Sequence, residues 1–218
     1  MKLFACAATL ALLAACGGSN TDMTPRTPRA PTLSDLYDDV RQLQGEVNLI
    51  TTQTPTSARN MPTSGTSTFR GGAIVVANRG GTEYNLIGDS ALTVDFGTEQ
   101  MSGQASGFRG FDNRGDTFAA PGQITYSGGQ IGVGGVPAAF SLSYRGSLDA
   151  GGDRVALSGN ATGGFGGNRT NGTIRTRSIL GVSGTPGSLT VQSGGTPNMV
   201  ATVNNAPAVA DFSFFGQN

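Results

Sequence analysis

The sequence predicts a mainly β protein, an antiparallel up-and-down β-barrel of about eight strands with a short N-terminal helix. Residues 66–218 contain short runs in which apolar and polar residues alternate, and glycine, 35 of the 218 residues, separates these runs. The connections between runs are of hairpin size, as local antiparallel pairing requires. Residues 32–52 differ, because their apolar positions recur at helical spacing. These observations together indicate a helix followed by a meander of strands.

The charge balance and the missing histidine narrow the function. With 14 basic and 14 acidic residues there is no net charge, so we expect no nucleic-acid partner, which would require a dense basic face. The chain has no histidine, which excludes Ser-His-Asp and Cys-His catalysis and histidine-ligated zinc. Its carboxylates are scattered and do not converge. We therefore predict that the protein is not an enzyme and needs neither a cofactor nor a metal.

Residues 1–15 have the features of a signal peptide. Lys2 precedes an apolar run of 13 residues, Leu3 to Ala15, which is shorter than the roughly 20 residues that a membrane-spanning helix needs. The following residue is Cys16, and Leu13-Ala14-Ala15-Cys16 resembles the lipobox of bacterial lipoproteins. This resemblance implies cleavage before Cys16, a diacylglyceryl thioether on its sulfur, and a further acyl chain such as palmitate on the new N-terminus.

Residues 16–31 form the next segment, and we expect a flexible tether there. They are rich in proline, threonine, glycine and serine and show no periodicity. Cys6 would leave with the signal peptide, so the mature chain would hold no disulfide. The lipid on Cys16 would then be its connection to the membrane.

Residues 32–52 are predicted to form a short heptad helix. Its apolar positions, three or four residues apart, are Leu33, Leu36, Val40, Leu43, Val47 and Ile50. Thr32 is the expected N-cap, with Asp35 three residues later, whereas Gly45 weakens the helix by about 1 kcal/mol relative to alanine. Two interpretations stay open: the apolar stripe packs on the body of the protein, or it mediates self-association.

Residues 53–65 are predicted to be a linker, and residues 66–218 the glycine-rich barrel domain. The clearest alternating runs place Leu92, Val94 and Phe96 on one strand face, and Phe140, Leu142 and Tyr144 on another. Such alternation predicts antiparallel strands with one wet and one packed face. It fits a two-sheet sandwich as well as a barrel, but closure of a barrel removes the exposed edges.

The segment 108–122 is the candidate partner-binding loop. It interrupts the alternation and combines apolar anchors with charges, as protein interfaces do. The residues expected to make contact are Phe108, Arg109, Phe111, Asp112, Arg114 and Asp116. A second interruption, 128–137, is expected to be another loop at the rim.

Three segments resemble the β-barrel domain of transferrin-binding protein B-like lipoproteins, a group that includes the factor H-binding protein barrel. They are SGTSTF (64–69), ALTVDFGTEQMSGQAS (91–106) and GNATGGFGG (159–167). The resemblance implies a lipid-anchored outer-membrane protein that binds a protein ligand through its loops. The chain is too short for a two-lobed receptor, so transferrin itself is not implied.

The sequence therefore predicts a lipoprotein of the outer membrane whose barrel binds a macromolecular partner through its loops and faces either the cell surface or the periplasm. An alternative is a periplasm-facing accessory lipoprotein without an external ligand, in which the helix docks onto an envelope partner. A barrel that binds a small ligand is a further alternative, but bulky inward residues are expected to fill an eight-stranded interior.

Overall fold

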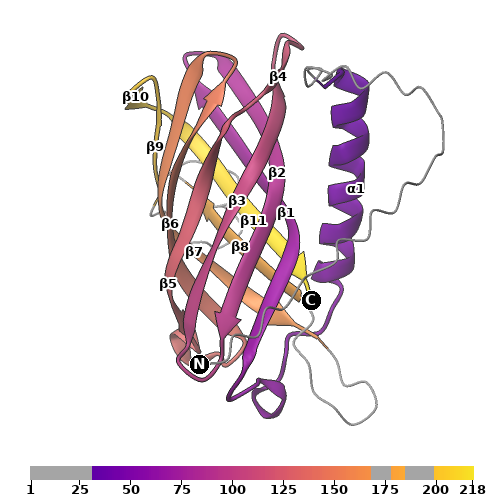
Figure 1. Cartoon of the computed structure of the whole chain (residues 1–218), viewed down its shortest axis with the longest axis vertical. Helices are drawn as coiled ribbons and strands as arrows, with labels where there is room; N and C mark the ends of the chain where they lie inside the picture. The colour runs from indigo at the N-terminus through magenta and orange to yellow at the C-terminus, as the bar shows by residue number, and fades with distance from the viewer. Residues whose placement is uncertain (1–30, 168–177, 185–198) are drawn as a thin grey trace, which may run out of the picture.

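The computed structural model describes residues 31–167, 178–184 and 199–218. Within them an α-helix stands beside a curved antiparallel sheet (Figure 1). The elements are α1 (Leu33–Thr51), η1 (Ala58–Asn60), β1 (Thr66–Arg79), β2 (Thr82–Asp95), β3 (Gln100–Asp112), β4 (Thr117–Ala119), β5 (Gly122–Ile131), η2 (Val133–Gly135), β6 (Ala139–Ala150), β7 (Asp153–Gly166), β8 (Ser178–Gly184), β9 (Val200–Val203), β10 (Ala206–Pro207) and β11 (Val209–Gln217). The predicted signal peptide, the lipidation site Cys16 and nearly all of the tether lie outside the described residues.

The sheet closes on itself because β7 pairs with β6 along one side and with β8 along the other. Around the ring the neighbours are β1, β2, β3, β5, β6, β7, β8 and β11, and β11 pairs again with β1. Between the described strands every pairing is antiparallel, and each strand lies beside the next in the ring. The predicted up-and-down barrel of about eight strands with a short helix is thus confirmed, and the closed order favours it over a sandwich.

Three of the eight barrel strands are interrupted, which is why eleven strands are labelled. β8 and β9 both pair with β7, with Val182 opposite Thr162 and Val200 opposite Ser158. Between these two pairs, β7 advances by four residues, whereas its partner chain advances by 18, from Val182 to Val200. β8 and β9 therefore occupy the place of one barrel strand, and residues 185–198 lie between them in the sequence. In the same way, β10 and β11 form one barrel strand, in which β10 pairs with β9 and β11 pairs with β8. β4 and β5 form another, since both pair with β3.

Aromatic side chains fill the interior of the barrel. Every second residue of a strand points inward, as Val155, Leu157, Ala161 and Phe165 do on β7, and each of these is buried. Neighbouring rings inside the barrel have centroids 4.7 to 6.2 Å apart. The rings in contact are those of Phe69, Phe96, Tyr126, Phe140, Tyr144, Phe165, Phe212 and Phe214. This packing agrees with the interior that an eight-stranded barrel is expected to have.

The helix α1 packs lengthwise against the outside of the barrel (Figure 1). At its N-terminus Thr32 and Asp35 form the reciprocal capping box that the sequence suggests. Along its stripe Leu36 is fully buried. A Cβ built on Gly72 of β1 would lie 2.7 Å from the side chains of both Leu43 and Phe215, so the helix packs closely over a position of β1 that has no side chain. This supports the interpretation in which the stripe covers the body of the protein.

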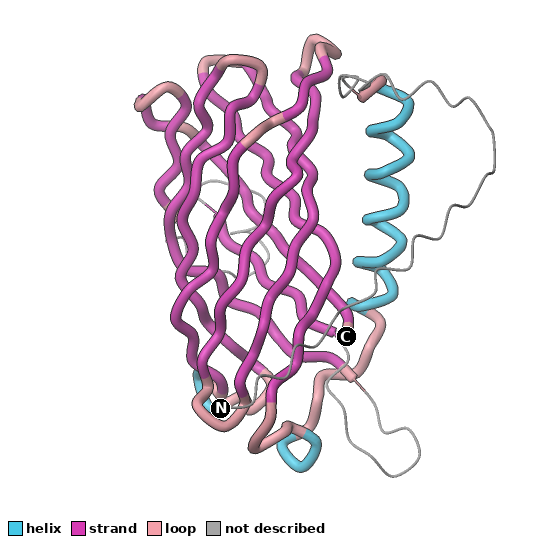
Figure 2. Tube along the Cα trace, viewed as in Figure 1, coloured by secondary structure: helices cyan, strands magenta, loops and turns pink. Residues whose placement is uncertain are grey.

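The linker between α1 and β1 contacts the lower end of the barrel. The N–H of Thr56 donates to the carbonyl of Phe165 over 3.0 Å, and Pro55 forms an isolated bridge with Gly166. Figure 2 shows this segment passing beneath the strands before β1 begins. The linker is therefore attached to β7, and it fixes the lower end of α1.

Candidate functional site

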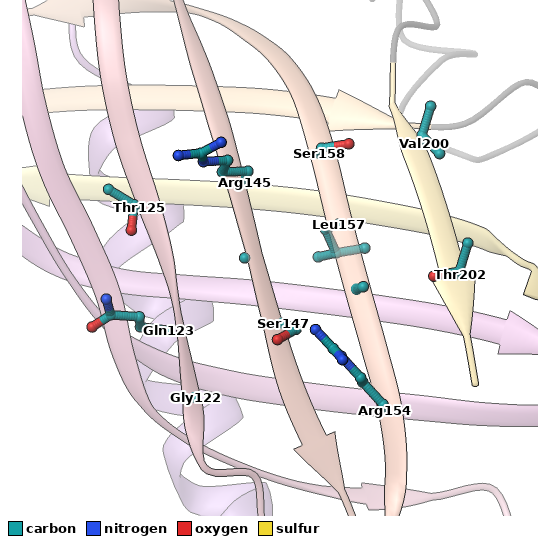
Figure 3. A pocket seen from close by; sticks show the side chains of 12 residues that line it. Gly122, Gln123, Thr125, Arg145, Ser147, Arg154, Leu157, Ser158, Val200 and Thr202 are labelled. Atoms are coloured by element: carbon teal, nitrogen blue, oxygen red, sulfur yellow. The ribbon is translucent and has the colours of Figure 1, made fainter. Parts of the chain in front are cut away.

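An open groove of about 640 Å³ lies on the outer face of the barrel, across β5, β6, β7 and β9. Figure 3 shows its side chains rising from these four strands. Its polar side chains are Gln123, Thr125, Arg145, Ser147, Arg154, Ser158 and Thr202. The small residues Ser147 and Ala156 lie in the middle, whereas both arginines are exposed. Among the described residues, no acidic side chain lines the groove.

A second cluster of polar side chains lies at the upper end of the barrel, where the turns after β1, β3, β6 and β9 come together (Figure 2). Tyr84 donates a short hydrogen bond to the carboxylate of Asp153, and the side-chain amide of Asn204 donates to the same carboxylate over 2.6 Å. Asn204 also accepts from the N–H of Arg154 over 2.9 Å. These bonds tie β2, β7 and the β9–β10 turn together, so the cluster fixes the upper rim.

The ionisation of this cluster follows from its contacts. Burial, followed by the hydrogen bond to Asp153, raises the pKa of Tyr84 to about 12. The hydrogen bonds from Tyr84 and Asn204 hold the pKa of Asp153 below its ordinary value. Tyr84 is therefore a neutral donor and Asp153 a charged acceptor at neutral pH, which is the pairing that the geometry requires.

The prediction that 108–122 forms a loop is wrong. β3 continues to Asp112 and β4 begins at Thr117, so only 113–116 connect them. Phe108 is 3% exposed and belongs to the core inside the barrel. The closely spaced glycines and charges conceal an alternation in which Phe108, Gly110 and Asp112 are buried.

Arg109 and Phe111 are on the outer face of β3, where they contact α1. Arg109 forms an ion pair with Asp39 over 2.8 Å, and the ring of Phe111 lies 5.7 Å from that of Tyr37. These two residues are thus engaged within the protein. They hold the upper half of the helix to the barrel.

Asp112, Arg114 and Asp116 form the tight turn after β3. Asp112 is 3% exposed, and it accepts from the N–H groups of Arg114 and Asp116 and from the guanidinium of Arg114, 2.7 Å away. Burial alone would raise the pKa of Asp112, but these hydrogen bonds outweigh it and lower that pKa. Of the predicted contact residues, Arg114 and Asp116 are the ones exposed at the rim.

The second predicted loop, 128–137, is also partly strand. β5 continues to Ile131 through an irregular register between Ser127 and Gln130, and η2 follows. The rim there is therefore shorter than the sequence suggests. Val136 is exposed at its tip.

The sequence pattern does not mark Arg145 or Arg154 as candidate site residues. The alternation around Leu142 and Tyr144 does place Arg145 on the outward face of its strand, which was the available signal. An outward arginine is ordinary on a solvated sheet, so it pointed to no site by itself. The groove becomes visible only when four strands are aligned.

A smaller hollow of about 470 Å³ lies between the C-terminal end of α1 and the outer face of β7. It is lined mainly by apolar groups, among them Ile50, Pro55 and Val136. No charged side chain from the described part of the chain lines it, so these residues offer no charge by which a ligand could be recognised.

The described residues contain no group of three or more acidic, histidine or cysteine side chains placed to hold a metal ion. In the same part of the chain, no helix combines the length and the apolar character that crossing a membrane requires. Comparisons with protein-family models, curated proteins and solved structures find no match for this chain, and the family resemblance remains a prediction.

Proposed function

We propose that the chain is an outer-membrane lipoprotein, anchored through Cys16, whose barrel binds a macromolecular partner with its outer surface. The proposal is for binding and not for catalysis. The observation that carries it is the contrast between an interior filled by aromatic rings and an open polar groove on the outside. A filled eight-stranded interior leaves no room for a ligand, so contact with a partner must be made on the outside.

The groove replaces the loop 108–122 as the main contact surface in this proposal. Phe108 is in the core, and Arg109 and Phe111 contact α1, which leaves Arg114 and Asp116 at the rim as secondary candidates. The alternative role, a periplasm-facing accessory whose helix docks on an envelope partner, would need a free apolar stripe. In this structure Leu36 and Ile50 are buried.

Anchoring is tested by fractionating cells that express the wild-type chain or Cys16→Ser. We expect the wild type in the membrane fraction and the variant as a soluble or uncleaved precursor, because Cys16 would carry the lipid. Retention of the variant in carbonate-washed membranes as a cleaved chain, without its signal peptide, would contradict the proposal.

Orientation and binding are tested on intact cells. External protease should digest the barrel, and crosslinking should capture a partner that is lost when the groove is altered. If the barrel is digested only after the outer membrane is opened, the periplasm-facing role is the correct one.

A further inference from the structure

The register of four strands arranges the groove as two rows of outward side chains. In the first row Thr125, Arg145, Ser158 and Val200 are successive neighbours across β5, β6, β7 and β9. In the second row Gln123, Ser147, Ala156 and Thr202 follow one another in the same way. With strands about 4.8 Å apart, each row spans about 14 Å. The groove is therefore long enough for several units of a chain-like ligand.

The two arginines of the groove have no ion-pair partner among the residues that the structure describes. Three other arginines in the described residues form ion pairs, namely Arg41, Arg109 and Arg114. No ion pair of Arg145 or Arg154 is found in that part of the chain. Asp149 is the cross-strand neighbour of Arg154, but its carboxylate accepts from the N–H of Gly152.

The directions of these side chains leave their guanidinium groups available. Figure 3 shows Arg145 extending toward β5 and Arg154 extending toward Ser147, so the two flank the small residues at the centre of the groove. Guanidinium groups bind carboxylate, sulfate and phosphate through paired hydrogen bonds. The local charge therefore selects an anionic ligand, although the whole chain has no net charge.

The remaining side chains favour a ligand rich in hydroxyl groups. Ser147, Ser158, Thr125 and Thr202 provide hydroxyls, and Gln123 provides a carboxamide. Extended peptides are commonly bound at the open edge of a sheet, but β7 is paired on both sides, with β6 on one and with β8 and β9 on the other. Small molecules are usually bound in enclosed pockets, so an open groove is better suited to a polymer that lies across it.

We propose that this groove binds an acidic polysaccharide, with Arg145 and Arg154 holding its anionic groups and the hydroxyl side chains contacting its sugars. This inference rests on the proposed function, because it names the chemistry of the partner that the outer surface would bind. The sugars provide donors and acceptors for the serine, threonine and glutamine side chains, and the anionic substituents provide the charge.

The test measures binding of the purified full chain to immobilised polygalacturonate, which carries a carboxylate on each sugar. We expect binding that weakens with added salt and falls at least about tenfold in the double variant Arg145→Gln, Arg154→Gln. The matched control is Arg70→Gln, which removes an exposed arginine of β1 outside the groove and should leave the affinity unchanged. Thermal melts of all variants should coincide, since the three side chains are exposed.

Two other polymers decide the class of ligand. Uncharged dextran should not bind, and poly-glutamate, a peptide polyanion, should bind more weakly than polygalacturonate. The inference is overturned if polygalacturonate does not bind, if the control loses as much affinity as the double variant, or if poly-glutamate binds equally well.

Failure of this inference can be distinguished from failure of the proposed function. If crosslinking on intact cells captures a partner but polygalacturonate does not bind, only the assignment of the ligand is wrong. If polygalacturonate binds through the two arginines but cleaved Cys16→Ser remains in washed membranes, the anchored-lipoprotein proposal is wrong, whereas the assignment of the groove is unaffected.

Discussion

Replacing Phe165 with alanine tests whether the barrel interior is as tightly packed as the ring contacts indicate. Phe165 is 1% exposed, and its ring centroid lies 6.1, 5.7 and 5.1 Å from those of Phe69, Phe96 and Phe140. Removing a buried phenylalanine ring costs about 3 to 5 kcal/mol, and three ring contacts place the expected loss near 4 kcal/mol. At about 2 to 4 °C per kcal/mol for a chain of this size, the melting temperature should fall by about 8 to 16 °C.

The assay is thermal unfolding followed by circular dichroism, with Phe111→Ala as the control. Phe111 is half-buried on the outer face and has a single ring contact, with Tyr37, so its loss should cost about 1 kcal/mol. Phe165→Leu, which keeps most of the volume, should cost less than about 1.5 kcal/mol and remain folded if the alanine variant does not. Equal losses for Phe165→Ala and Phe111→Ala would refute a packed interior, and with it the reason for placing the binding surface outside.

Three further predictions concern backbone, helix and ionisation. Gly103→Ala should lower the free energy of unfolding by about 1 to 3 kcal/mol in urea titrations, because its Cβ would overlap the carbonyl of Ala91. Gly45→Ala should instead stabilise α1 by about 1 kcal/mol, since a Cβ at Gly45 meets no atom within 4 Å. If Gly45→Ala were the destabilising variant and Gly103→Ala the stabilising one, the close strand contact at Gly103 would be contradicted. Leu36 of α1 is fully buried, so Leu36→Ala should lower the free energy of unfolding by about 2 to 3 kcal/mol in the same titration. The sedimentation coefficient should not change. A change of oligomeric state would instead favour the interpretation in which the stripe mediates self-association. The pKa of Tyr84 is raised from 10.0 to about 12, so its contribution to the stability of the fold is complete below pH 10 and is lost as the pH rises to 12. Between pH 10 and pH 12 the melting temperature of Tyr84→Phe should therefore fall less steeply than that of the wild type. Parallel declines of the two melting temperatures would contradict the raised pKa.

The class of the fold could be predicted from the sequence because inward and outward residues alternate wherever a strand lines the core. The pattern around Phe140, Leu142 and Tyr144 corresponds to β6, and each of these residues is buried. The helix was predictable for a similar reason, since its stripe and its cap at Thr32 are local features. Local patterns of this kind do not depend on distant parts of the chain.

The sequence of 108–122 predicts a loop, although β3 continues to Asp112, because the strand carries unusual residues inward. Gly110 has no side chain, and the charge of the buried Asp112 is balanced by Arg114 of the following turn. Neither residue type is one that the sequence alone would assign to the core. Polar or missing side chains at inward positions conceal the two-residue period on which strand prediction relies.

The groove could not be predicted from local pattern, because it depends on the pairing of distant strands. The turn at Gly151 and Gly152 sets the register that brings Arg145 beside Ser158, and a hairpin of this kind can be predicted from the sequence. The contribution of β9 to the groove cannot be predicted in this way. Val200 and Thr202 join the groove only because β9 resumes a strand that β8 began, on the other side of residues 185–198.

The most direct test of the central claim is hydroxyl-radical footprinting of the full chain with and without polygalacturonate, read at three exposed valines. Val200 is 66% exposed and lines the groove, whereas Val136 and Val209 are 55% and 48% exposed and lie outside it. If the partner is bound on the outer face across β5, β6, β7 and β9, oxidation of Val200 should slow several-fold while Val136 and Val209 react at unchanged rates. Unchanged oxidation of Val200, or equal protection of all three valines, would contradict it.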